Sequence, residues 1–271
     1  MKSNGEYVPR IVLAVVVAAL FGVQWAFGDF PMWLFAAPMN LLVGALWLVV
    51  LWEGYRRRER SAIVRYMLSA EATYTSLAVA AVAALVLGLQ SVPASASWPA
   101  VGGYLFVLTH LTFVILRGWR NKSGVRLRFV VLHGGIWLAM ASMLFGAPDK
   151  QILRMELGSE PCRMALDERG DSRLLDYELS LAAFDVQHYE DGSPQRFCAT
   201  VRVDGEEVDI EVNSPYSPSY GEDIYLVSYD AKGCILQIVR EPWRAVTATG
   251  VAMLLLGAFM MFMQGFRREE R

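Results

Sequence analysis

A series of apolar runs, each about as long as a membrane is thick, constrains this chain more than any other feature. About 20 helical residues at 1.5 Å per residue cross the roughly 30 Å hydrocarbon core of a bilayer. Six such runs are expected to form helices: Ile11–Phe27, Met32–Trp52, Ala70–Val92, Ala100–Leu116, Phe129–Ala147 and Val246–Phe262. Hydrophobic residues make up 55% of the chain and charged residues 19%, which is typical of an integral membrane protein. Pro38 inside the second run predicts a kink there.

The basic residues predict how these helices are oriented. Arginines gather in the connections at residues 53–65 and 117–128, and the positive-inside rule places both connections in the cytoplasm. Both termini then lie on the cytoplasmic side, and the region between the fifth and sixth spans lies outside. The first run lacks a small-residue cleavage site, so we expect a retained helix rather than a cleaved signal peptide.

The region between the last two spans has a different character. Apolar and polar residues alternate in several short runs, including Leu179–Val186, Phe197–Val203, Val208–Val212, Ile224–Tyr229 and Ile235–Val239. Asp204–Gly205 is a strong hairpin signal, and Ala231–Lys232–Gly233 is another. Nine basic and twenty acidic residues give residues 148–241 a charge of −11. The predicted fold is a six-helix transmembrane bundle with a small antiparallel β domain inserted on the outer face between helices 5 and 6. Its expected parts are residues 1–147, 148–241 and 242–271.

The cysteines and the absence of catalytic motifs narrow the chemistry. Cys162, Cys198 and Cys234 are odd in number and form no C-x-x-C pair, which disfavours a thiol carrier. They form either one disulfide with a free thiol or three mostly buried small side chains. No nucleophile elbow, zinc-protease motif, P-loop or dinucleotide fingerprint occurs, so a hydrolase or nucleotide enzyme is not indicated.

Two histidines lie within predicted spans. His110 is seven residues before Arg117, and His133 is five residues after Arg128, so both sit at a similar depth and are able to face each other across antiparallel helices. A neutral imidazole is an axial ligand for haem iron, and Gly134 and Gly135 leave room for a flat macrocycle or another helix. The alternative is that each histidine is a packing residue that hydrogen-bonds Thr109, Thr112 or Ser142. His188, in the strand region, is expected to be a solvated loop residue.

Several segments resemble one family when they are taken in order. The span FVVLHGGIWLAMASMLFGA precedes a strand-rich region, and residues 210–262, which include SPYSPSYGEDIYLVSYD and REPWR, close the chain. The earlier segments LFAAPMNLL and GGYLFVLTHLTFVILRGWR belong to the same pattern. Over most of Phe35–Phe262 the chain resembles the small ResB-like form of the ResB/CcsB family of system II cytochrome c biogenesis.

The resemblance implies a function and a set of partners. A ResB/CcsB subunit of the bacterial inner membrane would act with a CcsA-type partner to deliver haem b across the membrane to apocytochrome c. It implies that His133 ligates the haem iron beside Gly134, and it assigns no role to His110. The chain lacks the W-W-D motif of the partner, so it would be at most part of a cytochrome c haem lyase complex. The alternatives are a membrane anchor of an oxidoreductase that uses His110 and His133 for haem or quinone, and a non-catalytic adaptor that displays a β domain.

Overall fold

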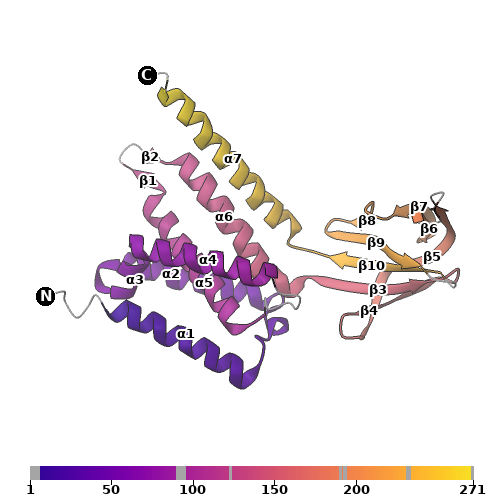
Figure 1. Cartoon of the computed structure of the whole chain (residues 1–271), viewed down its shortest axis with the longest axis horizontal. Helices are drawn as coiled ribbons and strands as arrows, with labels where there is room; N and C mark the ends of the chain where they lie inside the picture. Colours follow the sequence, from indigo (N-terminus) through magenta and orange to yellow (C-terminus); the bar gives the residue numbers. More distant parts are fainter. Residues whose placement is uncertain are drawn as a thin grey trace. The chain divides into compact units, whose positions relative to one another are not determined.

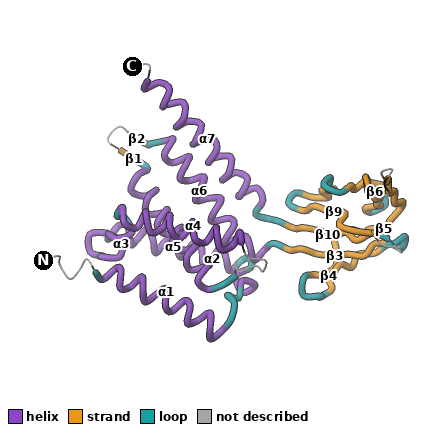
Figure 2. The backbone as a smooth tube through the Cα atoms, in the orientation of Figure 1, coloured by secondary structure: helices purple, strands orange, loops and turns teal. Residues whose placement is uncertain are grey.

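The structure of the protein is a computed structural model that describes residues 7–89, 96–121, 124–188, 191, 194–229 and 233–269 (Figure 1). The chain divides into two compact units. The helical unit combines Met1–Pro148 with Val246–Arg271, and the β unit is Asp149–Ala245. Figure 2 shows that helices make up the first unit and strands the second.

The helical unit is built from seven helices and a small hairpin in the described residues. The helices are α1 (Val8–Phe27), α2 (Met39–Arg56), α3 (Ala62–Met67), α4 (Ala70–Leu89), α5 (Trp98–Gly118), α6 (Leu127–Gly146) and α7 (Arg244–Glu269). The antiparallel pair β1 (Arg120–Asn121) and β2 (Gly124–Val125) joins α5 to α6.

Four segments of the described chain are long and apolar enough to cross a membrane. These segments are Val8–Phe27, Trp98–Gly118, Leu127–Asp149 and Arg244–Met263. The expected six-span bundle is therefore supported for four helices, and α4 is a shorter apolar helix over Ala70–Val86. The end of the expected span Ala70–Val92 lies outside the described residues.

The second expected span is interrupted rather than kinked. Residues Met32–Phe35 form a short 3-10 turn, and α2 begins only at Met39, directly after Pro38. Proline has no backbone N–H and disfavours helical geometry in the residue before it, so the break falls where the proline stands. The basic connection after α2 also contains the short helix α3, which Ser61 caps by accepting a hydrogen bond from the Val64 backbone N–H (3.3 Å).

Helix α6 packs closely against α7 through small residues. A Cβ atom added at Gly135 would lie 2.4 Å from the backbone nitrogen of Leu254, and one at Gly250 would lie 2.5 Å from that of Ala139. The Ser142 and Thr247 hydroxyls hydrogen-bond across the same contact (2.8 Å). The two helices run antiparallel, and glycine allows their backbones to touch.

The β unit is one antiparallel sheet of eight strands in the order β7-β6-β5-β4-β3-β10-β9-β8. The strands are β3 (Gln151–Leu157), β4 (Cys162–Asp167), β5 (Ser172–His188), β6 (Pro194–Val203), β7 (Glu206–Glu211), β8 (Tyr216–Ser219), β9 (Glu222–Tyr229) and β10 (Cys234–Arg240). The predicted hairpin at Asp204–Gly205 is confirmed, because both residues have positive φ between β6 and β7. The turn expected at Ala231–Lys232–Gly233 lies partly outside the described residues.

The long strand β5 allows the sheet to enclose its own core. Its first half pairs with β4 and its second half with β6, and the register shifts between Leu181 and Ala183. Strand β7 also contacts β9, so the sheet curls toward closure. Residues of every strand pack in the interior, including the fully buried Leu153, Leu179, Val201, Ile224 and Leu236, and the short β8 contributes the partly buried Tyr216.

The glycine contact between α6 and α7 yields a paired test. Gly135→Ala should destabilise the helical unit by about 1–3 kcal/mol, because the new methyl group collides with backbone rather than with a movable side chain. Gly134→Ala is the matched control, since its Cβ would meet only the Met253 methyl group at an ordinary 3.6 Å. Thermal unfolding of both variants in detergent measures the difference, and equal midpoints would contradict the contact.

Candidate functional site

His133 lies in α6 with one ring nitrogen engaged. Its Nδ1 is 3.0 Å from the carbonyl oxygen of Phe129, four residues earlier. A carbonyl only accepts hydrogen bonds, so Nδ1 carries the proton and Nε2 keeps its lone pair. A backbone carbonyl that fixes the tautomer in this way is typical of histidines that bind metals. The half-buried imidazole therefore has the protonation pattern of an axial ligand.

The ring of His133 also takes part in a stack on one side of α6. The Phe129 ring lies against it with centroids 4.0 Å apart, and the Arg126 guanidinium lies 4.9 Å from the centroid of the Phe129 ring. Gly118 of α5 makes room for Phe129, since a Cβ atom there would lie 2.4 Å from the ring. Packing against α5 thus holds the residue that supports His133.

His110 lies on a different side of α5 from the one that meets α6. Tyr104 and Thr112 mark the α6 side, where the Tyr104 hydroxyl donates to the Met140 carbonyl (3.1 Å) and Thr112 accepts from Trp137 Nε1 (2.8 Å). His110 is seven residues after Gly103, so these two residues lie on the same side of α5. That side faces α4, because a Cβ atom at Gly103 would lie 3.2 Å from Val79 of α4. The structure does not bring His110 to His133, contrary to the expectation that the two rings face each other.

His110 has a structural partner of its own. The side chain is only 5% exposed, and Nδ1 lies 2.9 Å from the Met67 carbonyl at the end of α3. Arg117 donates to the next carbonyl, that of Leu68. Together these two residues satisfy carbonyl groups that the end of a short helix leaves unpaired. The expected partners Thr112 and Ser142 bond Trp137 and Thr247 instead, so neither histidine depends on them.

The two glycines after His133 have different surroundings. Gly135 is buried and is used by the contact with α7. Gly134 meets only the methyl group of Met253, and a Cβ atom there would be at an ordinary distance. Gly134 therefore lies against the end of a flexible side chain, whereas Gly135 lies against backbone.

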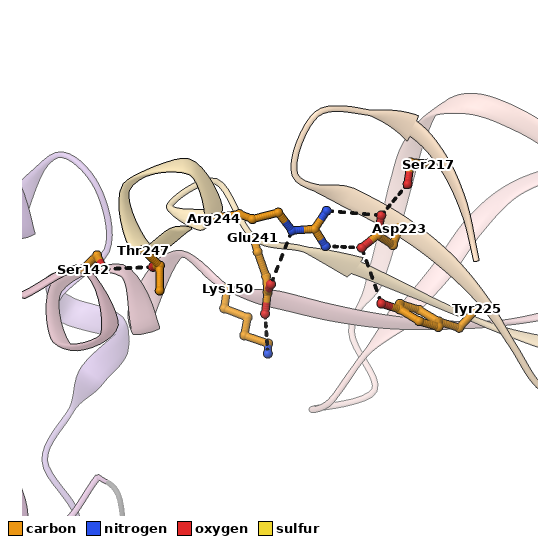
Figure 3. Close-up of polar contacts among 8 residues, drawn as sticks. All are labelled: Ser142, Lys150, Ser217, Asp223, Tyr225, Glu241, Arg244 and Thr247. Carbon is orange, nitrogen blue, oxygen red and sulfur yellow. Dashed lines mark hydrogen bonds and ion pairs between the residues drawn. The ribbon is translucent and has the colours of Figure 1, made fainter. Parts of the chain in front are cut away.

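A second group of polar residues lies in the β unit, near the start of α7 (Figure 3). Asp223 is 4% exposed and accepts hydrogen bonds from Arg244, from Ser217 (2.6 Å) and from Tyr225 (3.4 Å). The Arg244 guanidinium lowers the pKa of the Asp223 carboxyl. Lys150 pairs with Glu241 (2.6 Å) in the same unit.

The neighbouring acid points to the other face of the strand. Glu222 is 8% exposed and accepts from the Tyr177 hydroxyl and from Arg240 Nε, both at 2.8 Å. Burial and the adjacent carboxylate raise the pKa of Tyr177. The sequence analysis gave these residues no role, although Arg240 and Arg244 both occur in the REPWR segment and both acids begin strand β9.

The thiols and the acids offer no further metal site in the described chain. Cys162, Cys198 and Cys234 are free thiols, so of the two alternatives the structure does not contain the disulfide. Burial raises the pKa of Cys234 to about 11, so its thiol is inert at neutral pH. No group of three or more histidine, cysteine or acidic side chains comes together among the described residues. An iron porphyrin, which needs only one or two protein ligands, fits this donor set better than a bare metal ion does.

Comparisons with known proteins agree on part of this picture. Residues 125–235, which include His133 and most of the β unit, match the model of the ResB-like family. A search of the curated proteins finds no match. Among the solved structures, one described as the cytochrome c haem lyase CcmF matches with 13% identity and a TM-score of 0.40. The match covers 83% of this chain and 45% of that one, so the chain spans less than half of the solved protein.

The buried pair of Asp223 and Arg244 predicts a dependence on pH. Since Arg244 lowers the pKa of Asp223 in the folded state, the pair stabilises the β unit above the ordinary carboxyl pKa of about 4. That contribution is lost as the pH falls through the lowered value. Asp223→Asn should therefore be less stable at pH 7 and lose stability less steeply between pH 5 and pH 2.

Acid unfolding of the full chain in detergent, followed by the circular dichroism of the strands, measures this difference. Glu168→Gln replaces an exposed carboxyl and serves as the control. An identical acid profile for Asp223→Asn and the unsubstituted chain would contradict the stabilising role of the pair.

Proposed function

Because residues 125–235 are ResB-like, we propose that this chain is a membrane subunit that handles haem during cytochrome c biogenesis. The match supports the role in cytochrome c biogenesis, and the four apolar helices support a membrane protein. The more specific proposal is a ResB/CcsB-type subunit of system II. It would act with a CcsA-type partner to deliver haem b across the membrane to apocytochrome c.

The observation that carries the proposal is the state of His133. Its Nδ1 proton is donated to the Phe129 carbonyl, so Nε2 is free to bind the iron of a haem cargo. We propose His133 as the ligand and Gly134 as the adjacent residue that the macrocycle approaches. The imidazole binds as the neutral form, and the backbone carbonyl keeps the ring from rotating about its side-chain bonds. His110, which is tied to Met67, is proposed to be a packing residue.

The orientation remains as the basic loops predict it. We propose that both termini and the arginine-rich connections are cytoplasmic in the bacterial inner membrane and that the β unit is periplasmic. The charge of −11 over residues 148–241 would attract a basic apocytochrome or a basic loop of the partner at low ionic strength. An impermeant maleimide tests the orientation: a Leu174→Cys variant that reacts only after spheroplasts are lysed would contradict it.

The chain alone is not proposed to attach haem. It has no W-W-D motif, and among the described residues no three histidine, cysteine or acidic side chains come together to hold a metal ion. Thioether formation would therefore belong to a complex with the partner subunit. A bis-histidine anchor is the weaker proposal, because the His110 imidazole is bonded to the Met67 carbonyl on the side of α5 toward α4, whereas His133 lies on α6.

Loss of the ligand should be visible as loss of haem. His133→Ala, purified with its membrane partner from cells with ample haem, should retain less than about one tenth of the haem of the unsubstituted chain, because the iron loses its proposed imidazole ligand. His110→Gln serves as the control, since it removes the other buried imidazole and should keep the haem. The retained haem is measured by its absorbance and as the pyridine haemochrome. Full retention of haem by His133→Ala would contradict the assignment of His133 as the iron ligand.

A further inference from the structure

Arg126 occupies a distinctive position relative to His133. It directly precedes α6, and its guanidinium lies over Phe129, whose ring is stacked on His133. Residues 126, 129 and 133 share one side of the helix, since they are separated by three and four positions. The guanidinium is therefore held in line with the imidazole by a cation–π contact and a ring stack.

The hydrogen-bonding groups of Arg126 are largely unused. Its Nη1 makes one long contact with the Gly118 carbonyl (3.5 Å), and the side chain is exposed. No described carboxylate pairs with it, whereas Arg10, Arg57, Arg240 and Arg244 each bind an acid. A guanidinium has five N–H donors in a flat fork that matches the two oxygens of a carboxylate. Arg126 thus presents donors suited to a carboxylate from outside the chain.

The spacing suits one ligand in particular. Seven residues separate Arg126 from His133, which is about 10 Å along the helix axis. Haem carries its iron at the centre of the ring and two propionate carboxylates on short flexible arms at one edge. A haem with its iron on His133 therefore has carboxylates within reach of the helix end where Arg126 stands. That end is also polar, so charged propionates avoid the cost of burial in hydrocarbon.

We propose that Arg126 binds a propionate carboxylate of the haem that His133 holds. This inference rests on the proposed function, because it takes His133 as the iron ligand. Arg126 is then a positioning residue that fixes the rotation of the macrocycle about the bond between iron and histidine, with Phe129 as the rigid element between the two contacts. Arg128, two residues further on, lies on the opposite side of the helix and takes no part.

Esterified haem separates this contact from the iron bond. Haem dimethyl ester keeps the iron and the ring but has no charged carboxylate. The full chain in detergent is titrated with haem and with the ester, and binding is followed by absorbance. The unsubstituted chain should bind haem about fivefold more tightly than the ester, which is the strength of a partly exposed charge pair.

Variants of Arg126 and Arg128 test which arginine causes the preference for haem over the ester. Arg126→Gln should bind haem and ester equally, Arg126→Lys should keep part of the preference, and the control Arg128→Gln should keep all of it. A preference that survives in Arg126→Gln overturns the proposal and points to a different anion, such as a lipid phosphate, as the partner of Arg126. If Arg128→Gln loses the preference for haem as fully as Arg126→Gln does, the proposal is also overturned, since any positive charge near this helix end would then explain the preference.

The failure of the proposed function would look different. His133→Ala should lose affinity for haem and for the ester alike, because the iron bond is common to both. If His133→Ala binds both as tightly as the unsubstituted chain, the iron ligand is wrong. The ratio of haem to ester affinity in Arg126→Gln still reports on the carboxylate contact in that event.

Discussion

Helix α6 packs against α2, α5 and α7, and the sides that meet α5 and α7 carry different residues. The side that meets α7 carries Gly135, Ala139 and Ser142, which allow the two backbones to approach. The side that meets α5 carries Phe129 and Trp137, with His133 between them. His133 lies on the α5 side because it is four residues after Phe129 and four before Trp137, and residues four apart share one side of a helix.

The β unit buries two successive acidic residues, Glu222 and Asp223. Glu222 and Asp223 point to opposite faces of β9, as neighbours in a strand must. Each carboxylate is matched by an arginine from the short segment that leads from β10 into α7, Arg240 for the first and Arg244 for the second. Buried charges of this kind are costly unless they are paired and hydrogen-bonded.

Features encoded by local periodicity or by one special residue were predictable from the sequence. The alternating runs gave five of the strands, and the hairpin at Asp204–Gly205 followed from residues that tolerate positive φ. The break at Pro38 was placed correctly but expected to be a kink, because a lone proline does not reveal whether neighbouring helices will satisfy the freed backbone groups. Strands β3, β4 and β8 were missed, since their alternation is short or diluted by charged residues.

The arrangement of the candidate site could be predicted only in part from separations along the chain. Distance from the basic loops gave the depth of His110 and His133, but depth does not determine which side of a helix a residue occupies. Gly103, seven residues before His110, lies against α4 and so indicates that His110 is on the α4 side of α5. The spacing of these two residues could be read from the sequence. The acids of the β unit looked like ordinary surface charges, because only the folded sheet shows that they are buried.

Rescue by a free ligand tests the central claim that the imidazole of His133 holds the iron. His133→Gly removes the side chain and leaves space beside Gly134, and added imidazole is able to take the vacant position on the iron. The account predicts that this variant loses haem and regains it, with the absorbance of a histidine-ligated iron, when imidazole is supplied. Haem binding by His133→Gly that matches the unsubstituted chain without imidazole would contradict the account.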